Sequence, residues 1–374
     1  MTAGTLGLIA SVIAGVLPVL VGAWQAQLHA SASEAGFVAA MELFAQVAGT
    51  LAFISLEWPW RRAAGLGLAF MAIGNAAAGT SATLASLLAA RALAGFGGGA
   101  VRALCMKCLT RAVSPGRAFA IYAALQVGIA ASVTALIPRL LATASIRVPF
   151  VGFAGLCAAA IGLIAFLPAQ PASRSGGATW RSLTRTSLCT LSALFTFFLG
   201  QAAVWTFLDP LGRAEGIASS AIEHALTWLN VAGLLGSLAI GALAHRANAL
   251  LAVCCLLLVT LGSTYALFHT HSASIFILAA CAFYFAWCAS FPFQFAIIAR
   301  ADEAGATGAA APAVDTLGLA SGAAITSALI PLHGIGIAGL IGASASLAAA
   351  GGYALGCSVF RRTIHAPLGA APRT

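Results

Sequence analysis

Two residues of opposite charge, Glu42 and Arg91, stand inside long apolar stretches of the sequence. A charge in the interior of a membrane helix costs about 2.5–3.5 kcal/mol on insertion scales, so it needs a partner or a wet cavity. Burial favours a neutral carboxyl group, whereas a nearby arginine favours the carboxylate. Three interpretations follow: a pair that binds and releases a proton, a permanent ion pair that stabilises the helices, and two charges that do not meet.

Four glycines, Gly95 and Gly97 to Gly99, follow Arg91 within the same apolar stretch. A phosphate-binding loop requires a strand before it and a soluble βαβ context, which this stretch lacks. Small residues on a membrane helix let neighbouring backbones approach closely. We therefore interpret the glycines as a helix-packing surface.

Aromatic rings and amides recur at helical spacing in the second part of the chain. Spacings of three and four residues place side chains on one face of a helix. The two stripes are Gln201, Trp205 and Asp209, and Tyr284, Trp287, Phe291 and Gln294. They are typical of a pocket for a partly aromatic organic molecule. The alternatives are plain packing and, near a surface, an interfacial aromatic belt.

The composition requires a membrane setting for these residues. Hydrophobic residues make up 61% of the chain and charged residues only 7%, whereas soluble domains average roughly 25% charged. The net charge of +9 does not indicate nucleic-acid binding, because the basic residues lie between apolar segments. Nine cysteines are present, and we interpret most of them as small buried apolar side chains. We expect no metal, no cofactor and no enzymatic activity, because no catalytic or ligand constellation converges.

A membrane span needs about 20 apolar residues, and on that measure the chain contains twelve. The predicted spans are 5–27, 36–56, 63–82, 84–106, 118–138, 149–168, 187–208, 222–243, 248–268, 273–298, 311–331 and 335–359. The prediction is therefore an all-α membrane protein built from two pseudo-symmetric six-helix bundles. The predicted domains are a first bundle at 1–168, a cytoplasmic linker at 169–186, a second bundle at 187–360 and a tail at 361–374.

The basic residues predict the orientation. Most arginines follow even-numbered spans, which by the positive-inside rule places both termini in the cytoplasm. The ends of the fifth and eleventh spans are similar, Thr134-Ala-Leu-Ile-Pro138 and Ser327-Ala-Leu-Ile-Pro331. Such a parallel repeat is typical of transporters with two bundles related by an axis along the membrane normal.

A charged group is also expected at the cytoplasmic end. Glu57, Arg61 and Arg62 lie in the loop after the second span, and Asp315 lies near the start of the eleventh. A carboxylate there stabilises a helix N-terminus, and this is the simpler interpretation. Alternatively, Arg61 or Arg62 reaches Asp315 across the bundles and latches a cytoplasmic gate.

The chain resembles the major facilitator superfamily over essentially its whole length. Arg91-Ala-Leu-Ala-Gly95-Phe-Gly97 is similar to the fourth-span motif of that family, and Glu57-Trp-Pro-Trp-Arg61-Arg62 to its acidic-then-basic loop motif. The fifth-span pattern of its proton-linked exporters is partly present, as Gly128 and Pro138. The resemblance implies alternating access, with the first and fourth spans of each half lining the cavity.

We therefore expect a secondary active transporter of a bacterial-type inner membrane that moves a small organic compound, with proton-coupled efflux as the first hypothesis. The alternatives are an uncoupled facilitator, a proton-driven importer and a non-transporting membrane sensor. The expected partners are the substrate, protons and the lipid bilayer. Nucleic acid is not expected, and the protein is expected to be a monomer.

Overall fold

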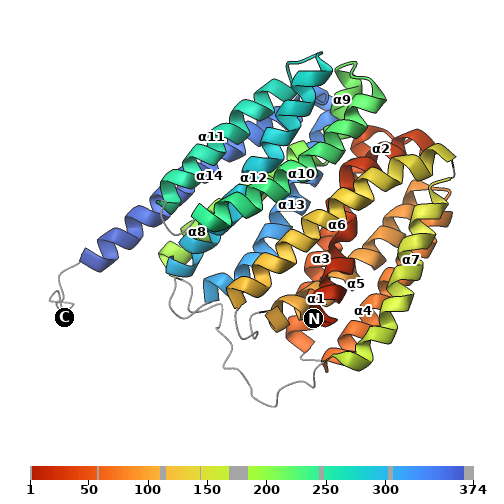
Figure 1. Cartoon of the computed structure of the whole chain (residues 1–374), viewed down its shortest axis with the longest axis horizontal. Coiled ribbons are helices and arrows are strands. Elements are labelled where there is room, and N and C mark those ends of the chain that lie inside the picture. Colours follow the sequence, from red (N-terminus) through yellow and green to blue (C-terminus); the bar gives the residue numbers. More distant parts are fainter. Residues whose placement is uncertain are drawn as a thin grey trace.

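The computed structural model describes residues 2–56, 59–109, 115–143, 145–167, 184–243, 248–301 and 306–365. These residues form helices and contain no strand (Figure 1). The elements are α1 (Thr2–Gly15), α2 (Leu17–Leu28), α3 (Ala32–Leu56), α4 (Trp60–Thr80), α5 (Leu84–Leu109), α6 (Pro115–Thr143), α7 (Arg147–Ile161), the 3₁₀ helix η1 (Gly162–Phe166), α8 (Arg185–Trp205), α9 (Leu208–Ala214), α10 (Ser219–Leu243), α11 (Ala249–Leu267), α12 (Ala273–Ala301), α13 (Ala306–His333) and α14 (Ile337–His365).

The helices agree with the predicted all-α membrane architecture. Among the described residues, nine helices are long and apolar enough to cross a bilayer, and the bent pair of α1 and α2 makes a tenth. The remaining predicted spans, the fifth and the eighth, coincide with α6 and α10. Most of the predicted linker, residues 169–183, lies outside the described part of the chain, as do residues 366–374 of the predicted tail.

One predicted span is bent, and another ends slightly earlier than predicted. The first was expected to be continuous over 5–27, but α1 and α2 meet at an angle of 48°. Pro18 lies in the first turn of α2, and it lacks the N–H that would continue the hydrogen bonding of α1. The seventh, expected over 187–208, is the continuous helix α8, which ends at Trp205. A separate short helix, α9, follows it and contains Pro210.

Packing repeats between the two halves of the chain. In the first half α3 packs against α5 and α4 against α7, and in the second half α10 packs against α12 and α11 against α14. The halves meet where α3 contacts α13, α6 contacts α10 and α2 contacts α9. We call the end with α2 and α9 the outer end and the end with the N-terminus the inner end, following the predicted orientation (Figure 1).

Glycines bring α3 and α5 into backbone contact. A Cβ atom added at Gly95 would lie 2.2 Å from the carbonyl oxygen of Glu42, and one added at Gly99 would lie 2.0 Å from that of Gln46. Only glycine permits this approach at these positions. The packing interpretation of the glycines is therefore confirmed, and the same packing holds Glu42 against the helix that carries Arg91.

Candidate functional site

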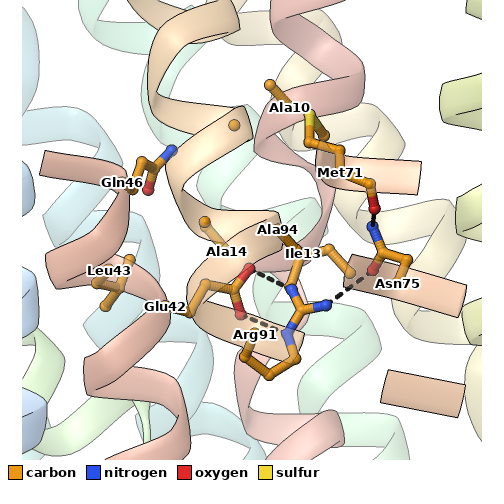
Figure 2. Close-up of a pocket in the computed structure, with 12 residues that line it drawn as sticks. Ala10, Ile13, Ala14, Glu42, Leu43, Gln46, Met71, Asn75, Arg91 and Ala94 are labelled. Carbon is orange, nitrogen blue, oxygen red and sulfur yellow. Dashed lines mark hydrogen bonds and ion pairs between the residues drawn. The ribbon is translucent and has the colours of Figure 1, made fainter. Parts of the chain in front are cut away.

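The predicted contact between Glu42 and Arg91 is present (Figure 2). Nε of Arg91 donates to Oε2 of Glu42 at 3.0 Å, and Nη2 donates to Oε1. This two-point arrangement, which matches the planar guanidinium to the carboxylate, gives a stronger and more directional pair than a single contact. Arg91 is completely buried, whereas the Glu42 side chain keeps 11% of its surface exposed.

Further groups surround the guanidinium. Nη1 of Arg91 donates to Oδ1 of Asn75 at 2.8 Å, and Nδ2 of Asn75 donates to the carbonyl oxygen of Met71 at 2.8 Å. The Phe150 ring lies 5.5 Å from the guanidinium carbon, within the range of a cation–π interaction. Helices α3, α4 and α7 thus all contribute to holding the Arg91 cation of α5.

A small cavity adjoins this ion pair. Its volume is about 10 Å³, and side chains of α1, α3, α4 and α5 line it, among them Ala14, Glu42, Gln46 and Arg91 (Figure 2). A cavity of this size is at the lower limit for a single water molecule. The carboxylate therefore borders a space for at most about one water molecule.

The predicted aromatic residues form one cluster between α8 and α12. Trp205 stacks on Tyr284 with ring centroids 4.9 Å apart and an interplanar angle of 15°. Trp287 meets Trp205 edge-on at 5.9 Å, and Phe291 stacks on Phe198 at 5.6 Å. We call these five residues the aromatic cluster. Phe198 was not predicted, although it lies two helical turns before Trp205 on the same face of α8.

The polar residues of the two stripes, Gln201, Asp209 and Gln294, differ in their hydrogen-bond partners. Gln294 donates to Oγ of Ser290 at 2.7 Å and accepts from the Tyr353 hydroxyl at 2.8 Å, so it joins α12 to α14. Gln201 is fully buried, and neither its amide oxygen nor its amide nitrogen has a hydrogen-bond partner among the described residues. Asp209 was expected to continue the stripe of Gln201, but the break after α8 places it in α9.

In α9, Asp209 accepts a hydrogen bond from Nε of Arg213 at 2.6 Å. The hydrogen bond to this carboxylate is the main reason that the pKa of Arg213 is raised. Asp209 therefore has an ionic partner near the outer end and is not available to the aromatic cluster.

The cross-bundle contact expected at the inner end has a different arginine. Arg102 of α5 donates to Oγ1 of Thr316 at 2.7 Å and to Oδ2 of Asp315 at 3.5 Å. Both acceptors belong to α13. The expectation that Arg61 reaches Asp315 is wrong, because Arg61 donates to backbone carbonyl oxygens at the end of its own half.

These acceptors are Ala165 and Leu167, at 3.1 and 3.0 Å from Nη2 of Arg61. Arg62 is exposed, and Glu57 lies outside the described residues. Across the described part of the chain, no group of three or more histidine, cysteine, aspartate or glutamate side chains is placed to hold a metal ion.

Comparisons with solved structures identify proteins with the same fold. The human organic anion transporter MFSD10 (TETRAN) is 17% identical, with 96% of this chain and 97% of that chain covered and a TM-score of 0.64. A D-xylose–proton symporter is 15% identical, with coverage of 93% and 95% and a TM-score of 0.72. A variant of the nucleoside transporter NupG is 14% identical, with coverage of 95% and 98% and a TM-score of 0.74.

A sequence comparison with curated proteins finds no match. The family model of the Major Facilitator Superfamily matches residues 3–326, which is most of the chain and includes both the ion pair and the aromatic cluster. The chain therefore belongs to the Major Facilitator Superfamily.

Proposed function

We propose that this protein is a proton-coupled secondary transporter that exports a small organic compound by alternating access, with Glu42 as the proton-binding group. The observation that carries the proposal is the buried Arg91, whose carboxylate partner adjoins a water-sized cavity. Intramembrane ionisable residues of this kind are characteristic of proton pathways in transporters.

The coupling follows from what protonation does to the pair. A protonated Glu42 no longer neutralises Arg91, and the guanidinium then keeps only the Asn75 amide and the Phe150 ring as described polar or aromatic partners. Leaving one member of a buried ion pair uncompensated costs about 3–5 kcal/mol. Proton binding is therefore favoured in a conformation that solvates Arg91, so a proton shifts the equilibrium towards that conformation.

Arg102, Asp315 and Thr316 supply a gate in this scheme. Their contact joins α5 of the first half to α13 of the second, so it must break when the inner ends of the halves separate. We propose that it latches the inner end, in the role that the sequence had suggested for Arg61 and Arg62. Glu57 remains a candidate member of this gate.

The aromatic cluster is the proposed substrate region, with Gln201 as its polar member. The names of the structural relatives refer to an organic anion, a sugar and a nucleoside, which supports a small organic substrate. The export direction rests on the resemblance of Gly128 and Pro138 to the fifth-span pattern of proton-linked exporters. We place both termini in the cytoplasm and propose a monomer in a bacterial-type inner membrane, with no nucleic-acid partner.

The second candidate function is an uncoupled facilitator. It is favoured by the complete burial of Arg91 and by its contacts to three helices, which also suit a permanent structural pair. In that case the protonation state of Glu42 does not change during transport.

Transport in proteoliposomes separates the two. Wild-type protein and Glu42→Gln are assayed with a nucleoside, D-xylose and an organic anion, with and without an imposed proton gradient. Proton coupling predicts that Glu42→Gln loses gradient-driven accumulation but retains exchange of labelled for unlabelled substrate. The matched control is Glu223→Gln, which removes an exposed carboxylate of α10. Normal gradient-driven accumulation by Glu42→Gln contradicts the proposal and favours the facilitator.

A further inference from the structure

Three buried polar atoms of α8 and α12 have no hydrogen-bond partner among the described residues: Oε1 and Nε2 of Gln201, and Nε1 of Trp287. Gln201 is 0% exposed and Trp287 is 7% exposed. Buried polar groups are nearly always paired, and an unpaired one destabilises the protein. Gln294 on α12 obeys this rule, since both ends of its amide are bonded. Single buried atoms are unpaired elsewhere in this half, for example Oγ1 of Thr206 and Oδ1 of Asn230, but among the described residues Gln201 is the one whose two side-chain polar atoms both lack a partner.

The unpaired groups share one location. Gln201 is three residues after Phe198 and four before Trp205, so the three side chains lie on one face of α8. The Trp287 ring contacts both neighbours, at 6.2 Å from the Phe198 centroid and 5.9 Å from that of Trp205. Gln201 is consequently on the α8 face that meets Trp287, in the middle of the aromatic cluster.

This location lies directly below a contact between the two halves. At the outer end, Gly36 of α3 closes on Phe207, and Gly22 of α2 closes on Asp209. Gln201 is six residues before Phe207, or about 9 Å along a helix axis. A ligand held at Gln201 would thus lie where the halves part during alternating access.

The surroundings exclude a charged ligand group. The only charged residue of α8 is Arg185 at its first position, and the only one of α12 is Arg300 near its end. Each is at least 13 residues, or about 20 Å of helix, away from Gln201 or Trp287. Glu42 and Arg91 neutralise each other in the opposite half. A charge bound here would have no counterion on α8 or α12 within about 20 Å of helix, which is strongly unfavourable in an apolar interior.

The available groups specify the shape of the ligand. The Gln201 amide presents one acceptor and two donors, and the Trp287 indole presents one donor. An edge that carries a donor next to an acceptor, as in a lactam, pairs with the amide at two points and leaves a further acceptor for the indole. Flat rings of the aromatic cluster favour a flat ligand through stacking. We infer that the substrate is an uncharged, planar heterocycle with a lactam-type edge, such as a nucleobase, bound by Gln201 and Trp287.

This inference rests on the proposed function, but its test requires no transport. Binding of uracil and of 1,3-dimethyluracil, which lacks the N–H donors, is measured by titration calorimetry on the purified full-length protein. D-xylose serves as the non-planar probe. We expect uracil to bind, 1,3-dimethyluracil to bind about tenfold more weakly or worse, and D-xylose not to bind.

Two variants test the residues. Gln201→Leu is expected to weaken uracil binding about tenfold or more, and Trp287→Phe, which keeps the ring but removes the N–H, several-fold. Trp228→Phe on the exposed face of α10 is the control. Gln201→Leu also removes two unpaired buried groups, so the ligand-free variant is expected to melt at a higher temperature than wild type. A purely structural role for Gln201 predicts a lower melting temperature.

Failure of uracil to bind, equal binding of uracil and its dimethyl form, or unchanged binding by Gln201→Leu overturns the inference. Failure of the proposed function has a different signature. In that case Glu42→Gln transports normally with a proton gradient, whether or not uracil binds. Conversely, proton-driven flux of another compound, without uracil binding, removes the substrate class and leaves the coupling intact.

Discussion

In the first half of the chain, the buried Arg91 has polar or aromatic partners on α3, α4 and α7. In the second half, the equally buried Gln201 has none among the described residues. The difference matters because an unpaired buried group destabilises a fold and persists where something else compensates for it. A satisfied network is suited to holding a charge in place, and an unsatisfied one is suited to receiving a ligand. The comparison therefore supports the proposal that proton chemistry belongs to the first half and substrate recognition to the second.

The largest expected effect comes from removing one member of the ion pair. Glu42→Leu leaves Arg91 buried without a counterion and is expected to lower the free energy of unfolding by about 3–5 kcal/mol. The double variant Glu42→Leu/Arg91→Leu removes both charges and is expected to recover most of that loss. Thermal unfolding of purified protein in detergent measures both. If the double variant is no more stable than Glu42→Leu, the two residues do not form an energetic pair.

Glycine substitutions test whether proton coupling depends on helix packing in the first half and substrate binding on helix packing in the second. Gly99→Ala places a Cβ atom 2.0 Å from the Gln46 carbonyl oxygen. Overpacking of this kind destabilises by about 1–3 kcal/mol. Because it separates α3 from α5, it should impair gradient-driven transport more than heterocycle binding. Gly152→Ala on α7 is the control, since no atom lies within 4 Å of its added Cβ atom.

The counterpart in the second half is Gly322→Ala, whose added Cβ atom lies 2.1 Å from the Leu199 carbonyl oxygen of α8. A similar destabilisation is expected, but here heterocycle binding should weaken while the Glu42–Arg91 pair keeps its geometry. Calorimetric binding and gradient-driven flux are measured on both glycine variants. If Gly99→Ala and Gly322→Ala weaken heterocycle binding and gradient-driven flux in the same proportion, the two halves do not differ in function.

The smallest effect is expected at the inner latch. The Arg102–Asp315 contact is 3.5 Å long and partly exposed, so it contributes at most about 1 kcal/mol. Arg102→Gln should shift the population towards an open inner end by a few-fold without a large change in melting temperature. Labelling rates of a cysteine introduced at the inner end of α13 report this shift. Arg61→Gln, which loses only contacts within its own half, should leave the labelling rate unchanged.

The sequence was sufficient to predict what depends on depth and helical spacing. The cost of a lone charge in an apolar span suggested that Glu42 and Arg91 pair, and three- and four-residue spacing collected most of the aromatic cluster. The bend in the first span escaped prediction, because a hydropathy window averages across Pro18. The partner of Asp315 escaped it too, because Arg102 is 213 residues away and nothing in the local pattern of either segment refers to the other.

The bend between α1 and α2 has a mechanical consequence. If α2 pivots near Val16, its twelve residues act as a lever arm about 18 Å long. A swing of about 20° there displaces the tip by about 6 Å, roughly the width of a small ring. Because α9 is a second short segment facing α2, the outer mouth can widen by tilting two short pieces while the long helices stay in register. A transporter built in this way needs little deformation of its packed interior to admit or release cargo on that side.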